Sequence, residues 1–180
     1  LYGGKAMYII GMKENILLAK EFFPDWVVHI YYNETVPEKH IKEFESLDAK
    51  CVLCENVGIN KLNWEGMFWR FYAASDPEVS IMISRDCDSR LSEREREAVK
   101  EWENSDKMFH IMRDHPHHAV EILGGMWGCK YPALKDMKQM ILNYKRGNFW
   151  QVDQNFLREV IYPLIVDDCF VHDCFYKKSA

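Results

Sequence analysis

Two carboxylates lie one residue apart in the segment "RDCDSR" (85–90), a spacing typical of a site for a divalent cation. Side chains two residues apart on an extended segment point the same way, so Asp86 and Asp88 can converge on one ion. Mg²⁺ and Mn²⁺ prefer such oxygen ligands and share their shell with water and substrate phosphates. The same pattern also occurs in solvated loops, where Arg85 and Arg90 would simply neutralise the two acids.

The flanking residues predict that this acid pair lies between a strand and a helix. The apolar run 79–83 indicates a buried strand, and Ser92 followed by Glu95 forms a capping box that starts a helix. Further strands are predicted at 6–12, 26–33 and 50–56, and further helices at 13–23, 37–47 and 64–75. This alternation predicts an α/β fold with a mostly parallel, mixed central sheet, in which ligands bind at the carboxyl ends of the strands.

Composition narrows the class of protein. A length of 180 residues with 48% hydrophobic content predicts one globular domain spanning 1–180. The formal charge of −5 argues against a nucleic-acid partner bound through a broad basic surface. The chain has no apolar run of the ~20 residues that span a bilayer and no signal peptide, so we expect a cytoplasmic protein without a membrane span. The first residue is Leu1, which leaves open whether the domain comes from a longer protein.

The six cysteines are scattered through the chain and indicate reduced thiols rather than a disulfide framework. A zinc site built from the C-x-x-C at 51–54 and the group Cys169, His172 and Cys174 is an alternative, but the second half lacks the spacing of known zinc modules. The histidines of "HIMRDHPHH" (110–118) are better explained as core or surface residues than as zinc ligands, and the proline in this stretch predicts a loop.

Several blocks together resemble a family of small glycosyltransferases of the GT-A fold, which includes a glycosyltransferase domain of large algal viruses and bacterial relatives. The resemblance covers nearly the whole chain and is carried by the order of the blocks "GMKENILLAKEFFPDWVVHIYYNETVP", "MFWRFYAASDPEVSIMISRDCDSRL", "FHIMRDHPHH", "ILGGMWGCK", "DQNFL", "IYP" and "HD". It implies a Rossmann-like, three-layer GT-A arrangement. It also implies transfer of a sugar from a nucleoside diphosphate sugar, with a UDP-sugar as the expected donor and a glycan as acceptor.

The resemblance also implies roles for individual residues. Asp86 and Asp88 match the acids that hold Mn²⁺ or Mg²⁺ on the donor diphosphate, and His172 matches a late histidine that supplies a further metal ligand. Arg70 matches a basic residue that reaches the donor; a partner for Glu65 or Asp76 is the alternative. Arg85 is placed to contact phosphate or to screen the acids.

The segment "ILGGMWG" (122–128) is expected beside the sugar-binding cleft. Gly124 and Gly125 would let the backbone approach a ligand or take positive φ; the alternative is a turn packed under Trp127. Asp153 and Gln154 fall in the first turn of a predicted helix from 152 to 164. There Asp153 either caps the helix or, as the resemblance implies, lies at the reacting carbon and takes the proton of the acceptor hydroxyl, with Asp114 as the second candidate base.

The nucleotide base is expected near the ends of the first strands, at Gly11, Met12 and Asn33, by analogy of fold. The chain has no G-x-G-x-x-G and no P-loop motif, which argues against a dinucleotide oxidoreductase or a P-loop enzyme. Two rival functions remain: a metal-dependent phosphoester hydrolase that uses the same acid pair, and a non-catalytic glycan-binding domain of the same fold.

Overall fold

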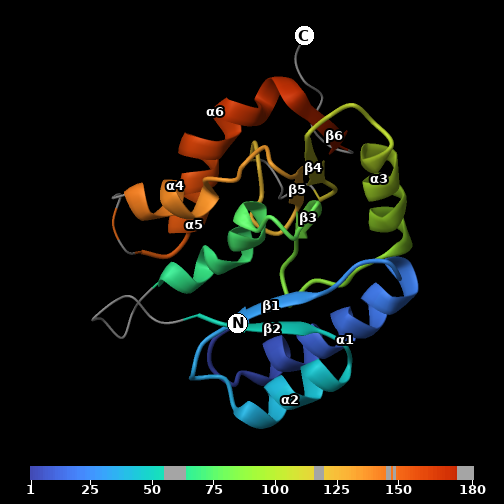
Figure 1. The fold of residues 1–180 in the computed structure, drawn as a ribbon, viewed down its shortest axis with the longest axis vertical. Helices are drawn as coiled ribbons and strands as arrows, with labels where there is room; N and C mark the ends of the chain where they lie inside the picture. Colours follow the sequence, from blue (N-terminus) through green and yellow to red (C-terminus); the bar gives the residue numbers. More distant parts are fainter. Residues whose placement is uncertain (55–63, 116–119, 145–146, 148, 174–180) are drawn as a thin grey trace. The chain divides into compact units, whose positions relative to one another are not determined.

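The computed structural model describes residues 1–54, 64–115, 120–144, 147 and 149–173. The chain divides into two compact units, which are described separately below. Unit 1 comprises Leu1–Arg70 and Asp86–Glu97, and unit 2 comprises Phe71–Arg85 and Ala98–Ala180. Both units contain helices and strands, so the fold is mixed α/β (Figure 1). None of the described helices has the length and apolar character needed to cross a bilayer.

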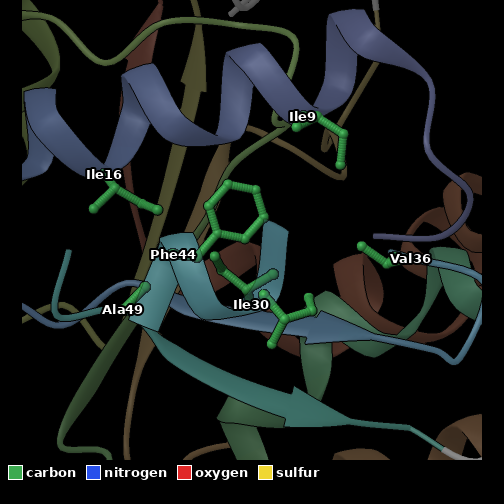
Figure 2. Packing of buried hydrophobic residues seen from close by; sticks show 7 residues of the cluster. Ile9, Ile16, Ile30, Val36, Phe44 and Ala49 are labelled. Atoms are coloured by element: carbon green, nitrogen blue, oxygen red, sulfur yellow. The ribbon is translucent and has the colours of Figure 1, made fainter. Parts of the chain in front are cut away.

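Unit 1 is built on a two-stranded parallel sheet of β1 (His29–Tyr32) and β2 (Lys50–Leu53), connected through helix α2 (Glu38–Ser46). This strand–helix–strand connection confirms the prediction for residues 26–56 as far as they are described. The 17-residue helix α1 (Ala6–Phe22) precedes it. The core of the unit is a cluster of buried apolar side chains from these elements: Ile9, Ile16, Ile30, Val36, Ile41, Phe44 and Ala49. Figure 2 shows the ring of Phe44 among the side chains of Ile9, Ile16 and Ile30.

The predicted strand at 6–12 is wrong, because these residues form the first part of α1. Buried positions recur at the helical spacing, as Ile9, Asn15, Ile16 and Ala19 show. The helical pattern is hidden in the sequence because Met7, Ile10 and Leu17 are also apolar and yet are about half exposed. An apolar run without a clear polar face resembles a buried strand, and only tertiary packing separates the two readings.

Unit 2 is built on a four-stranded mixed sheet in the order β3-β5-β4-β6 (Figure 1). Its strands are β3 (Ile81–Ser84), β4 (Phe109–Arg113), β5 (Trp127–Lys130) and β6 (Cys169–Asp173). The β3–β5 and β5–β4 pairs are antiparallel and the β4–β6 pair is parallel. The expectation of a mostly parallel sheet is therefore wrong for this sheet, because the unpredicted strand β5 lies between β3 and β4 and runs against both.

The other predicted helices agree with the structure in part. Helix α3 (Glu93–Glu103), which begins in unit 1 and continues in unit 2, starts where the capping box predicted. Helix α4 (Met137–Asn143), which was not predicted, follows β5. The predicted helix from 64 to 75 is instead two 3₁₀ helices, Trp64–Met67 and Trp69–Ser75, the second of which leads from unit 1 into unit 2.

The predicted helix from 152 to 164 is helical throughout, as α5 (Val152–Phe156), a π-helical segment (Leu157–Ile161) and α6 (Tyr162–Ile165). The π-helical segment changes which residues are buried. The sequence predicted an apolar face at every fourth residue, yet Leu164 is 65% exposed and Ile161 and Ile165 are fully buried. A wider π turn inserts one residue into the repeat, and this moves the buried face by one position.

Candidate functional site

The acid pair lies in a loop between β3 and α3, as predicted. We call residues Asp86–Ser92 the acid loop; β3 ends at Ser84 and α3 begins at Glu93. The capping box is present, since the Glu95 amide donates to Ser92 Oγ at 3.4 Å. Ser89 turns the loop by donating from its amide (3.3 Å) and its hydroxyl (2.9 Å) to the carbonyl oxygen of Asp86.

The two carboxylates have different surroundings. Asp86 is half-exposed and forms an ion pair with Arg70, whose Nη1 contacts Asp86 Oδ1. Arg70, on the 3₁₀ helix Trp69–Ser75, also donates from Nε to the carbonyl oxygen of Met67, the last residue of the preceding 3₁₀ helix, at 3.2 Å. Asp88 is exposed to solvent. Arg90, which the alternative interpretation pairs with the two acids, donates from Nε to Glu14 Oε2 at 2.5 Å.

Helix α1 holds the acid loop through its backbone. The side chain of Asn15 donates from Nδ2 to the Ser89 carbonyl at 2.8 Å and accepts from the Leu91 amide at 3.1 Å. One turn earlier, a Cβ at Gly11 would overlap the carbonyl oxygen of Cys87, so only glycine allows this approach. Sequence reasoning missed Asn15. The signal that could have found it is an amide side chain inside an apolar helical repeat.

The chemistry of this donor set fits a hard divalent cation that is carried by a diphosphate. Two carboxylates from one loop leave most of the shell of such an ion to phosphate oxygens and water, which is the usual arrangement for Mg²⁺. Within the described part of the chain, no three His, Cys, Asp or Glu side chains are grouped so as to hold a metal ion. Burial raises the pKa of the Cys87 thiol, so the residue between the acids offers no thiolate.

The three residues expected near the nucleotide base occupy different positions in unit 1. Gly11 and Met12 lie within α1 and not at the end of a strand; Met12 packs against the hydrophobic cluster. Asn33 follows β1 and is buried, and its Oδ1 accepts from the amide of Thr35 at 3.2 Å and from its hydroxyl at 2.5 Å. Base binding by these residues stays a prediction.

In unit 2, the predicted residues Gly124 and Gln154 lie next to each other. Gln154 Oε1 accepts from the Gly124 amide at 3.3 Å, and Ser84 Oγ donates to the Gly124 carbonyl at 2.6 Å. Neither Gly124 nor Gly125 takes positive φ, so a strained turn is not the reason for these glycines. Arg85 donates from Nη1 to the Ser84 carbonyl at 2.7 Å.

The two candidate bases differ in accessibility. Asp153 lies in the first turn of α5, as predicted, and is fully buried. Asp114 follows β4 directly and is partly exposed. An acceptor hydroxyl can reach a partly exposed carboxylate in the described conformation, whereas the carboxylate of Asp153 has to be uncovered first.

His172 lies on β6 and both of its ring nitrogens are hydrogen-bonded. Nδ1 lies 2.8 Å from Nε2 of His110, and Nε2 lies 3.0 Å from Oε2 of Glu101. His110 is fully buried and stacks on Trp102 with 5.1 Å between ring centroids. Burial lowers the pKa of His110 to about 3, and the charges of Arg85 and His172 contribute. As a metal ligand, His172 would have to give up one of its hydrogen bonds; this role stays a prediction.

Two other histidines of the predicted loop, His117 and His118, and the cysteine Cys174 lie outside the described residues. His115 is described and is exposed. Burial raises the pKa of Cys51 to about 11, so this member of the C-x-x-C is a thiol at neutral pH.

Comparison with known proteins relates the chain to glycosyltransferases at the level of fold. No protein-family model matches the sequence, and no curated protein matches it. A crystal structure of a glycosyltransferase involved in the glycosylation of the major capsid of PBCV-1 aligns with 82% of this chain and 83% of its own chain. The TM-score is 0.51 and the sequence identity is 16%. At this identity the likeness shows a glycosyltransferase-like fold.

Proposed function

We propose that the chain is a metal-dependent glycosyltransferase of the GT-A type that moves a sugar from a nucleoside diphosphate sugar, expected to be a UDP-sugar, to a glycan acceptor. The observation that carries this proposal is the acid loop. Asp86 and Asp88 are presented on a short loop whose backbone is held by α1, in a chain whose fold resembles that of a glycosyltransferase.

Asp86 and Asp88 would hold Mn²⁺ or Mg²⁺ on the donor diphosphate. Such an ion neutralises the charge that develops on the leaving diphosphate. Arg70 would move from Asp86 to the diphosphate when the ion takes up the carboxylate, because a guanidinium pairs with phosphate oxygens as well as with a carboxylate. The carboxylate of Asp86 would thus be neutralised by Arg70 without donor and by the metal ion when the donor is bound.

The transfer breaks the bond between the anomeric carbon and the diphosphate oxygen and forms a bond from that carbon to the acceptor oxygen. The acceptor hydroxyl loses its proton in this step, and a carboxylate is the natural base. Asp153 and Asp114 are the candidates. Replacement of the true base by Asn should lower kcat by roughly 100-fold or more while nucleotide binding is kept. The other replacement should leave kcat within a few-fold.

Thermal unfolding with a panel of nucleoside diphosphates tests the donor site. The panel is measured with and without Mn²⁺ on the wild type, on Asp88→Asn and on Asp25→Asn, which alters an exposed acid of the same unit. A ligand at 100 times its Kd adds about 2.7 kcal/mol to the free energy of unfolding. We expect one nucleotide to stabilise the wild type and Asp25→Asn only when Mn²⁺ is present, and to leave Asp88→Asn unchanged.

The same experiment separates the rival functions. If no nucleotide stabilises the protein under any metal, the donor site is refuted. Stabilisation by oligosaccharides alone would then favour the glycan-binding domain. Metal-dependent release of phosphate from simple phosphoesters would favour the hydrolase.

A further inference from the structure

We infer that Asn15 is a positioning residue: it sets the geometry of the two metal-binding carboxylates by holding the backbone of the acid loop from helix α1. This inference rests on the proposed function, since it assigns Asn15 to the metal–diphosphate site. Asn15 would not touch the ion or the donor; it would act through Asp86 and Asp88.

The first support is the placement of an amide in an unfavourable position. Asn15 lies in the middle of α1, where asparagine is a weaker helix former than alanine or leucine. Its side chain is buried, with 7% exposure, and its neighbour Ile16 belongs to the hydrophobic cluster. A buried amide is costly unless it is hydrogen-bonded. A leucine at this position would favour the helix more and would bury apolar surface. The presence of an amide is therefore explained by the hydrogen bonds that it makes.

The second support is that both polar ends of this side chain bind the same loop. Nδ2 donates to the Ser89 carbonyl and Oδ1 accepts from the Leu91 amide. These two backbone groups lie one and three residues after Asp88. One planar amide group therefore fixes the loop just after the second carboxylate. It does so both as a hydrogen-bond donor and as an acceptor.

The third support comes from two neighbours of Asn15 on α1. Gly11 lies one turn earlier, on the same face of the helix, and allows the Cys87 carbonyl to lie against it. Glu14 binds Arg90. The contacts of α1 thus reach the backbone at Cys87, Ser89 and Leu91, which alternate with the charged residues of the loop. Backbone held on both sides of Asp88 restricts where its carboxylate can go.

Groups that orient metal ligands typically affect metal affinity 10- to 100-fold when they are removed. We therefore expect Asn15→Ala to weaken binding of Mn²⁺ with UDP by roughly tenfold or more. The matched control is Ile16→Ala, which damages the core from the adjacent position of the same helix. Both variants are titrated with Mn²⁺ and UDP by calorimetry, at a temperature at which each is fully folded.

Two further readouts distinguish positioning from mere stability. The Leu91 amide should exchange with solvent faster in Asn15→Ala than in Ile16→Ala. The electron paramagnetic resonance spectrum of bound Mn²⁺ should broaden or change shape only in Asn15→Ala, because only there is the ligand geometry loosened.

The outcomes are separable. Weaker binding in Asn15→Ala with wild-type binding in Ile16→Ala supports the inference. Equal binding in the wild type and in Asn15→Ala overturns it and leaves the proposed function standing. If the wild type itself does not bind Mn²⁺ with UDP, the proposed metal–UDP site is refuted, and with it the role of Asn15 in that site.

Discussion

Arg70 and Asp86, which both belong to unit 1, form an ion pair. The pair brings together two residues that the sequence assigned separately to the donor site. One of the two carboxylates of the acid loop thus has a guanidinium as its partner. At the proposed metal site, an ion would therefore compete with the guanidinium of Arg70 for the carboxylate of Asp86.

This competition predicts opposite effects of Arg70→Gln on two binding reactions. Removal of the guanidinium leaves Asp86 without its cation, so Mn²⁺ alone should bind more tightly, by about threefold to tenfold for ~0.7–1.4 kcal/mol of lost repulsion. Mn²⁺ with UDP should bind more weakly, because a charge-assisted bond to phosphate is lost. Calorimetric titration of both ligands measures the two effects. A variant in which both affinities rise would mean that Arg70 only neutralises the loop.

Gly11→Ala should destabilise the protein, although alanine normally strengthens a helix. In the interior of a helix, replacing Gly by Ala gains about 1 kcal/mol. Here the added Cβ would overlap the Cys87 carbonyl, so helix and loop must separate. Urea unfolding measures whether the free energy of unfolding falls in this variant. The control is Gly4→Ala, where a Cβ would meet only Pro37 carbons at 3.4 Å. A more stable Gly11→Ala protein would contradict the close approach of α1 to the loop.

Stability should fall with acid between pH 6.5 and pH 3 because of His110. The folded protein keeps this imidazole neutral down to a pKa of about 3, whereas the unfolded chain takes up a proton near the ordinary value of 6.5. Below pH 6.5 the unfolded state therefore binds more protons, and the free energy of unfolding falls by about 1.4 kcal/mol per pH unit.

The test compares wild type and His110→Gln in urea unfolding at pH 6.5 and pH 5, above the range in which exposed carboxylates titrate. Wild type should lose about 2 kcal/mol more than the variant over this interval. The groups that face His110 are Trp102, His172 and Arg85. An identical pH dependence in both proteins would show that the pKa of His110 is the same in the folded and the unfolded protein.

Lys130→Met should lower the free energy of unfolding by about 1–3 kcal/mol. The Lys130 ammonium donates to three carbonyl oxygens at the carboxyl end of α3, those of Trp102 (3.2 Å), Glu103 (3.3 Å) and Ser105 (2.9 Å). It also lies 5.5 Å from the centre of the Trp102 ring. Removing the charge leaves these carbonyls without their cation.

Lys135→Met, at an exposed lysine, is the control and should change the free energy of unfolding by less than about 0.5 kcal/mol.

The sequence predicted correctly those features that are governed by local rules. The capping box of Ser92 and Glu95 marked the start of α3, and short apolar or β-branched runs marked β1, β2 and β3. The acid pair was consequently placed between the correct elements. Arg70 was also selected, although its pairing with Asp86 depends on tertiary structure.

The features that the sequence did not predict depend on contacts between distant residues. The first part of helix α1 was mistaken for a strand because its exposed residues there, Met7 and Ile10, are as apolar as the buried Ile9. Strand β5 is four residues long, and its glycine Gly128 gives no strand signal; its place between β3 and β4 follows only from pairing. The role of Asn15 likewise required the loop, 74 residues further along the chain, to be seen against the helix.

The position of β6 has a consequence for the order of folding. Strand β4 is buried at all five of its positions, and one of its two edges is completed only by β6, about 60 residues later in the chain. Closing so long a loop is slow compared with forming a helix or a hairpin. During synthesis, this edge of β4 stays unpaired until residues 169–173 have been made. In that interval β4 can pair with a strand of another chain. We therefore expect a chain that is halted before Cys169 to aggregate, and expect the completed sheet to be protected from this.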